Sequence, residues 1–196
     1  MSRIIGVTDT HPTHPLVQEA FARDLSRAGK ILQVTRAGAL VPEVYDACAH
    51  MSDAVQKMNG LPAEVKALAT LLVYMRVGCV MCLDLSSVVA RTQGVTEEKL
   101  MALRGYKTSP LFSKTERAVL RLAEAMTRTP AHVAHEDFEA LKQFYSEAQL
   151  MELIILIAAT NMGSRIGRAL DLAPEGFSEG QFCVVPVQEF EPMNQE

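Results

Sequence analysis

The chain has 196 residues and a net charge of -4, with 48% hydrophobic and 21% charged residues. This is enough apolar material for a core of ordinary size, so we treat residues 1–196 as a single domain. The slightly acidic balance excludes the basic stripe that a nucleic-acid-binding surface needs. We therefore expect no nucleic-acid partner.

The N-terminal lead, residues 1–15, reads MSRIIGVTDTHPTHP. It lacks the basic segment, apolar run and small-residue cleavage site of a secretory signal peptide. The longest apolar run, LIILIAA at residues 153–159, is shorter than the roughly 20 apolar residues that span a bilayer. We expect a cytoplasmic protein without a membrane partner.

Helical patterns then follow one another along the chain. Apolar residues at helical spacing, with turn residues between them, predict helices at residues 16–30, 41–60, 61–77 and 79–92, a short helix that begins after Thr96, and further helices at residues 113–127, 135–145 and 146–170. Three starts carry capping side chains: Thr96 precedes two glutamates, and Ser113 and Ser146 each open a capping box. The pattern predicts an all-α fold, and a loose echo between the third and the sixth of these segments hints at two similar helical halves.

The last predicted helix is apolar on nearly all sides between Leu150 and Ala159. A helix that is apolar all round is buried, and in so small a protein this favours a subunit interface as well as a core. The C-terminal tail, residues 173–196, follows it. Residues 181–190 have some β character, which Pro186 interrupts.

The stretch GCVMCLDLSS, residues 78–87, carries the chemistry that stands out in this sequence. Positions three apart are neighbours on one face of a helix, so Cys79 and Cys82 lie side by side if Gly78 ends the preceding helix. The free amides and the positive dipole end of a helix N-terminus stabilise a thiolate, which is the reactive form of cysteine. Two thiols one turn apart can also close a disulfide after one of them is oxidised.

Three other interpretations of the cysteine pair remain open. A structural zinc site needs four ligands, and Cys48 with His50, or Cys183, would have to complete it. A thioredoxin-like site would follow a β-strand, whereas the residues before Cys79 have a helical pattern. The two cysteines can also be inert and buried, as cysteines commonly are.

The order of these segments resembles a known family. The pair in its helical setting is followed by TEEKLMAL, by SPLFSKTERAVLRLAEAMT and by a closing helix containing IAATNMGSRIG. Over residues 30–172 this combination resembles the AhpD-like branch of the carboxymuconolactone decarboxylase family. The resemblance implies an all-helical fold and homo-oligomers, either trimers or hexamers, with no cofactor and no metal.

The resemblance also implies an activity, which is the thiol-dependent reduction of hydroperoxides by a peroxiredoxin-type enzyme. By position, Cys82 is the thiol that peroxide attacks, and Cys79 donates a proton and resolves the product as a disulfide. A dithiol or lipoylated protein then reduces the pair. Members that decarboxylate a muconolactone lack this cysteine pair.

This sequence departs from the family where the proton relay is expected. The family's glutamate lies twelve residues before the first cysteine and its histidine four after the second, and these positions hold Ala67 and Ser86. A serine can pass a proton along but is not a base near neutral pH. Glu64, one turn before Ala67, and Arg76, three residues before Cys79, are the candidate substitutes. Each also has a purely structural interpretation. Glu64 can be a first-turn acid that interacts favourably with the helix dipole, and Arg76 can be a solvated charge or a salt-bridge partner.

The sequence therefore predicts a thiol oxidoreductase with an incomplete proton relay. Two alternatives remain beside it. The first is a non-catalytic helical oligomer that serves as a binding or redox-sensing module. The second is a lyase of the decarboxylase type.

Overall fold

The computed structural model describes residues 2–186, and these form nine α-helices and one short 3-10 helix without a β-strand. The elements are α1 (Pro15–Ala28), α2 (Gln33–Gly38), α3 (Pro42–Lys57), α4 (Ala63–Val77), α5 (Val80–Thr92), α6 (Glu97–Ala102), η1 (Leu103–Gly105), α7 (Lys114–Thr127), α8 (His135–Lys142) and α9 (Glu147–Ala169). The predicted all-α class is confirmed. The part of residues 181–190 that the structure describes, up to Pro186, is irregular, and the rest of that segment lies outside the described residues.

The capping side chains begin their helices as predicted. The Thr96 hydroxyl accepts the amide of Lys99 at the start of α6. Ser113 and Ser146 form complete capping boxes at the starts of α7 and α9. Each serine accepts one of the amide groups that the first turn of a helix leaves without a partner.

The helix α2 was not predicted from the sequence. It has six residues, and its N-cap, Leu32, provides no capping hydrogen bond. A helix this short gives too little periodicity to distinguish it from a turn. It is held instead by packing, since Thr35 and Ala37 are buried.

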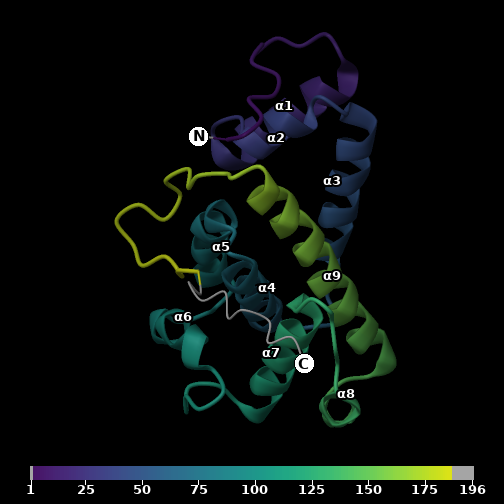
Figure 1. Cartoon of the computed structure of the whole chain (residues 1–196), viewed down its shortest axis with the longest axis vertical. Helices are drawn as coiled ribbons and strands as arrows, with labels where there is room; N and C mark the ends of the chain where they lie inside the picture. The colour runs from purple at the N-terminus through teal and green to yellow at the C-terminus, as the bar shows by residue number, and fades with distance from the viewer. Residues whose placement is uncertain (1, 187–196) are drawn as a thin grey trace.

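Helix α4 is the centre of the fold. Its buried residues lie on all sides, from Val65 to Met75, and it packs against α5, α7 and α9. Figure 1 shows α1, α2 and α3 grouped at one end of the molecule, with α9 running from that group along the rest. Helix α4, rather than α9, is therefore the helix buried all round.

Helix α9 has a buried side and an exposed side. Leu153 and Ile157 are completely buried in the core, while Met151, Met162 and Ile166 are exposed. By length and composition alone α9 could cross a membrane. The central helix of a folded core has the same composition, and α9 contacts α3, α4, α5, α7 and α8 along its length.

Candidate functional site

The cysteine pair lies at a reversal of the chain between α4 and α5. Gly78 ends α4 in the left-handed conformation, with φ 80°, which glycine adopts without a steric cost. The amides of Gly78 and Cys79 both donate to the carbonyl oxygen of Tyr74, at 2.9 and 3.1 Å. Cys79 is then the extended N-cap residue of α5, and Cys82 is its third helical residue. The predicted first-turn position is confirmed.

Cys79 and Cys82 are joined by a disulfide, with their Cα atoms 5.3 Å apart. Cys79 is 2% exposed, whereas Cys82 is partly exposed. The two sulfurs therefore have different access to solvent. A reagent that approaches from outside meets Cys82 first.

The floor of this site is Gly167 on α9, a residue that sequence reasoning missed. A Cβ atom on Gly167 would lie 2.8 Å from Cys79 Sγ and 3.5 Å from Cys82 Sγ. The backbone of α9 thus approaches both sulfurs as closely as glycine alone allows. Glycine in a helix interior costs about 1 kcal/mol relative to alanine. A glycine inside this long helix was therefore the sequence signal that another group approaches the backbone closely there.

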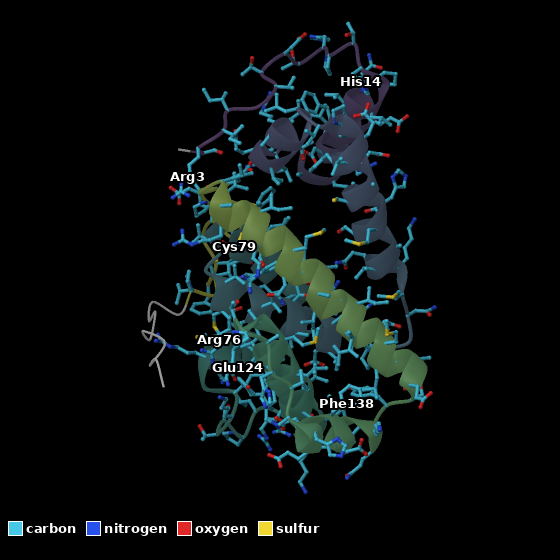
Figure 2. The ribbon with its side chains drawn as sticks, turned by 45° about the vertical axis from the view of Figure 1, so that its right-hand side comes forward. Arg3, His14, Arg76, Cys79, Glu124 and Phe138 are labelled. Atoms are coloured by element: carbon cyan, nitrogen blue, oxygen red, sulfur yellow. A yellow bond between two sulfur atoms is a disulfide. The ribbon has the colours of Figure 1, made fainter. Side chains whose placement is uncertain are left out.

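Arg168, the next residue of α9, lies against the turn that precedes the cysteines. Its Nε would be 3.7 Å from a Cβ atom on Gly78, and its guanidinium also lies 3.6 Å from Asp171. Figure 2 labels Cys79 beside the C-terminal part of α9. The site therefore has one cation nearby that the sequence did not point to.

The two positions of the missing proton relay are occupied as follows. Ala67 is 6% exposed and packs in the core. Ser86 lies one turn after Cys82 on α5 and near the Tyr74 side chain. Burial raises the pKa of Tyr74, and the Ser86 hydroxyl opposes the rise. Ser86 is thus close to the cysteine turn, and Tyr74 is the hydroxyl that stands beside it.

The candidate substitutes Glu64 and Arg76 both have other partners. Glu64 is in the first turn of α4, about 20 Å along the helix from Gly78, and it accepts a hydrogen bond from Lys99 at 2.6 Å. Arg76 forms an ion pair with Glu124 on α7 at 2.7 Å, as Figure 2 shows by the labels of both residues. Both positions match the structural alternatives given for them above, and neither residue contacts the sulfurs.

The two remaining cysteines are separate from the pair. Cys48 and Cys183 are free thiols, each partly buried. Cys183 lies beside Ser87 on α5, with 3.8 Å between Ser87 Oγ and Cys183 Sγ, and Cys48 is on α3. In residues 2–186, no three side chains of His, Cys, Asp or Glu are grouped as metal ligands.

Asp84 on α5 holds the C-terminal segment. It is 3% exposed and accepts hydrogen bonds from the amides of Glu175, Phe177 and Ser178 and from the Ser178 hydroxyl. Burial alone would raise its pKa, but these hydrogen bonds outweigh burial and lower the pKa to about 2. Asp84 is a structural anchor for residues 175–178.

Comparison with known proteins agrees with the fold. Residues 42–125 match the carboxymuconolactone decarboxylase family. The chain is 29% identical over 131 residues to the uncharacterized protein YnjA of Escherichia coli (strain K12), covering 67% of this chain and 69% of that protein. It is 31% identical over 94 residues to the uncharacterized protein YdfG of Bacillus subtilis (strain 168), covering 47% of this chain and 64% of that protein.

Solved structures with the same fold include the debrominase Bmp8 in its apo form. It superposes with a TM-score of 0.74 at 25% identity, over 83% of this chain and 88% of that chain. A peroxidase-related protein from Ralstonia eutropha JMP134, described as an alkylhydroperoxidase AhpD core, gives a TM-score of 0.71 at 18% identity, over 88% and 96% of the two chains. These comparisons agree with the resemblance found in the sequence: residues 42–125 match the carboxymuconolactone decarboxylase family, and the chain has the fold of solved structures described as AhpD-like.

Proposed function

We propose that this protein is a thiol-dependent oxidoreductase in which Cys79 and Cys82 cycle between a dithiol and a disulfide while a small hydroperoxide is reduced. The observation that carries the proposal is the disulfide-bonded pair in the first turn of α5. A pair at a helix N-terminus is suited to form a thiolate and to close a disulfide within one turn.

The unequal exposure of the sulfurs supports a division of roles. Cys82 is partly exposed and sits where the free amides of the first turn of α5 stabilise a negative charge. Cys79 is buried against Gly167. Cys82 is therefore the thiol that meets the peroxide, and Cys79 is the resolving thiol.

The proposed cycle has three steps. The Cys82 thiolate attacks the terminal oxygen of ROOH, the O–O bond breaks, and the products are the Cys82 sulfenic acid and, after protonation, ROH. The Cys79 thiol then displaces water from the sulfenic acid and closes the disulfide, so the peroxide has gained the two electrons that the pair has lost. A dithiol or lipoylated protein reduces the disulfide by thiol–disulfide exchange.

Proton transfer is the slow part of this cycle in our proposal. Ala67 and Ser86 provide no base, and Glu64 and Arg76 are bound elsewhere. The helix N-terminus therefore has to stabilise the thiolate without an imidazole beside it. Ser86→His restores a base one turn after Cys82, and we expect it to increase the rate of peroxide reduction at pH 7 by about 10- to 100-fold.

The test uses reduced protein and one equivalent of cumene hydroperoxide, followed by free-thiol titration and intact mass. We expect the wild type to lose two thiols and two hydrogens in mass. Cys82→Ser should leave the peroxide unconsumed, while the matched variant Cys79→Ser should stop at a sulfenic acid that dimedone labels. Peroxide consumption by Cys82→Ser at the wild-type rate would contradict the proposal.

A second candidate is reductive debromination, favoured by the structural similarity to the debrominase Bmp8. A cysteine-to-alanine variant of that protein has been solved in complex with 2,3,4-tribromopyrrole. The same dithiol chemistry would convert one C–Br bond to C–H, with the pair oxidised to the disulfide and bromide and a proton released. Bromide release from 2,3,4-tribromopyrrole, measured beside peroxide consumption, separates the two candidates.

The non-enzymatic and lyase alternatives give different results in the same assays. A redox-sensing or binding module would form the disulfide without sustained turnover when a dithiol such as dihydrolipoamide is supplied. A decarboxylase-type lyase would keep its activity in Cys79→Ser and Cys82→Ser. A homo-oligomer, trimer or hexamer, is part of the proposal, and a solution mass equal to the 21.5 kDa chain would contradict that part.

A further inference from the structure

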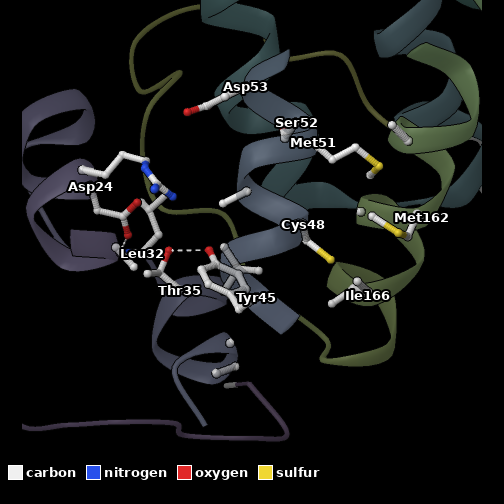
Figure 3. Close-up of a pocket in the computed structure, with 18 of the residues that line it drawn as sticks. Asp24, Leu32, Thr35, Tyr45, Cys48, Met51, Ser52, Asp53, Met162 and Ile166 are labelled. Carbon is white, nitrogen blue, oxygen red and sulfur yellow. Dashed lines mark hydrogen bonds between the residues drawn. The ribbon is translucent and has the colours of Figure 1, made fainter. Parts of the chain in front are cut away.

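A cavity lies between α1, α2 and α3 on one side and α9 on the other, and Tyr74 of α4 also lines it. Its volume is about 550 Å³, within the range of small-molecule sites. Figure 3 shows Cys48 and Met51 of α3 facing Met162 and Ile166 of α9 across it. Neither Cys79 nor Cys82 lines it.

The cavity has an apolar part and a polar end. The apolar part is lined by aliphatic and sulfur-containing side chains, including those of Val44, Cys48, Met162 and Ile166. The polar end is lined by Asp24, Thr35 and Tyr45, together with the charged pair of Arg27 and Asp53. This division suits a molecule with an apolar body and one polar group.

Tyr45 at the polar end is fixed in place. Its hydroxyl oxygen lies 2.8 Å from the Thr35 hydroxyl oxygen, a contact drawn as a dashed line in Figure 3. A Cβ atom on Gly38 would lie 2.1 Å from the Tyr45 ring, so the ring packs directly on the glycine. The phenol is therefore held before any ligand binds.

The hydrogen bonds at this end leave one acceptor free. The Asp24 carboxylate accepts the Leu32 amide at 2.8 Å. Burial raises the pKa of Asp24, and the Leu32 amide and the neighbouring Thr35 hydroxyl oppose the rise. Either hydroxyl can be the donor in the contact between Thr35 and Tyr45, and no other hydrogen bond to the Tyr45 hydroxyl is made within residues 2–186. In both cases Tyr45 Oη keeps at least one lone pair that can accept a hydrogen bond.

The charges at this end balance. Arg23 and Arg27 line it together with Asp24 and Asp53, and Arg27 donates to both oxygens of Asp53 at 3.0 and 3.3 Å. With two cations and two carboxylates, the end does not select a charged ligand. A neutral group that donates a hydrogen bond matches it best.

We propose that this cavity is a binding site for a compact, neutral, largely apolar molecule whose single hydroxyl or N–H group donates a hydrogen bond to Tyr45 Oη. Neither cysteine of the pair lines the site, and the cavity is present with the disulfide closed. It is therefore testable on the oxidised full-length protein.

The test uses the fluorescent probe N-phenyl-1-naphthylamine, with 1-naphthol and 1-methoxynaphthalene as competitors. We expect one probe to bind per chain, with saturation. The competition Kd of 1-naphthol should be about three- to tenfold lower than that of 1-methoxynaphthalene, because the methyl ether has no hydrogen-bond donor. Tyr45→Phe should remove this preference and leave binding of 1-methoxynaphthalene unchanged. Absence of saturable probe binding, or a preference that persists in Tyr45→Phe, would overturn the proposal.

A matched pair of variants on α9 locates the site. Gly163 lines the cavity, and a Cβ atom there meets no atom within 4 Å, so Gly163→Phe can fill the space. Ala158 is exposed on the same helix and does not line the cavity, so Ala158→Phe is the control. We expect the first variant to weaken probe binding at least tenfold and the second to leave it unchanged; equal effects would overturn the proposal.

Cys48 provides a readout that does not depend on these variants. In oxidised Cys183→Ser protein, Cys48 is the single free thiol, and 1-naphthol should slow its alkylation by iodoacetamide. Alkylation that 1-naphthol does not slow would place the bound molecule elsewhere. Full protection of Cys48 without any ligand would mean that a second copy of the chain covers the cavity. Either result would overturn the proposal.

Discussion

Among single residues, Gly167 connects the fold most directly to the thiol chemistry. Any larger residue at this position would place its Cβ atom 2.8 Å from Cys79 Sγ. The disulfide fixes that sulfur, whereas a free thiol can rotate away from the added methyl group. The oxidised state is therefore the one that needs glycine.

We predict that Gly167→Ala makes the Cys79–Cys82 disulfide easier to reduce. The expected shift in its reduction potential is about +30 mV, a tenfold change in the equilibrium constant for a two-electron couple. Equilibration with a series of dithiothreitol ratios, followed by thiol alkylation and mass measurement, gives the value. Gly163→Ala, on the same helix and with open space at its Cβ position, is the control, and an equal shift in both variants would contradict the argument.

Asp84 is the residue whose charge contributes most clearly to stability. Its pKa falls from 3.8 to about 2 in the folded protein, which corresponds to about 2 kcal/mol of stability at neutral pH. Because the folded pKa is depressed, this contribution is present above the unfolded pKa and is lost as the pH falls from about 4 to about 2.

We predict that Asp84→Asn lowers the free energy of unfolding by about 2 kcal/mol at pH 7. The amide group keeps one acceptor oxygen but turns an NH2 group toward the amides of residues 175–178. Urea unfolding at pH 7, 5 and 3 measures the difference. The difference in free energy of unfolding between wild type and variant should become smaller from pH 5 to pH 3. A difference that stays constant would exclude the Asp84 charge as its cause.

The residues of the site differ in how far the sequence could reveal them. Cys79 and Cys82 were predicted because their spacing and the glycine before them are local features. Gly167 and Arg168 lie almost ninety positions further along the chain, and their contact with the cysteine turn exists through the packing of α9. No local pattern encodes such a contact. The roles assigned to Cys79, Cys82 and Ser86 stay predictions.

At the scale of elements, capping chemistry was the most reliable guide. Thr96, Ser113 and Ser146 each begin the helix predicted from them, since a capping side chain satisfies amides of its own first turn. Where an element depends on tertiary contacts, as α2 does, the sequence pattern did not predict it. The apolar pattern of α9 between Leu150 and Ala159 was interpreted as burial in a core and a subunit interface. In the single chain Leu153 and Ile157 are buried while Met151 and Ala158 are exposed, and the interface stays a prediction.

Three helices are joined by one lysine. Lys99 of α6 lies 2.6 Å from Glu64 of α4 and 2.6 Å from Glu116 of α7. Burial by itself would lower the pKa of Lys99. The hydrogen bonds to Glu116 and Glu64 outweigh burial, so the pKa is raised. The short helix α6 is thus attached to the two longer helices through its charge as well as through Leu100, which is buried.

We predict that Lys99→Met lowers the free energy of unfolding by about 1 to 3 kcal/mol at pH 7, because it leaves two carboxylates close together without a cation. The loss of unfolding free energy in the variant should become smaller as the pH falls below about 4.5. Without the lysine beside it, Glu116 is protonated in that range, and the repulsion between the two carboxylates disappears. Thermal unfolding at pH 7 and pH 4 measures both values. Lys114→Met, on an exposed position at the start of α7, is the control and should change little at either pH.

For the whole molecule, stability rests on the core around α4 rather than on the disulfide. The core gathers residues from α3 to α9, and many of them are fully buried, including Leu71, Leu120 and Leu153. The disulfide joins residues only three apart. Closing so short a loop removes little entropy from the unfolded chain, and the stabilisation from it is about 2 kcal/mol. A pair that is cycled by oxidation and reduction requires a fold of this kind.

We therefore predict that reduction leaves the protein folded. With tris(2-carboxyethyl)phosphine, the midpoint of thermal unfolding should fall by about 4 to 8 °C, the shift expected for about 2 kcal/mol in a chain of this length. Helical circular dichroism at 25 °C should be unchanged. The Cys79→Ser, Cys82→Ser double variant should match the reduced wild type and be insensitive to the reductant. Loss of helical signal on reduction would show that the disulfide is structural, and it would count against the proposed thiol cycle.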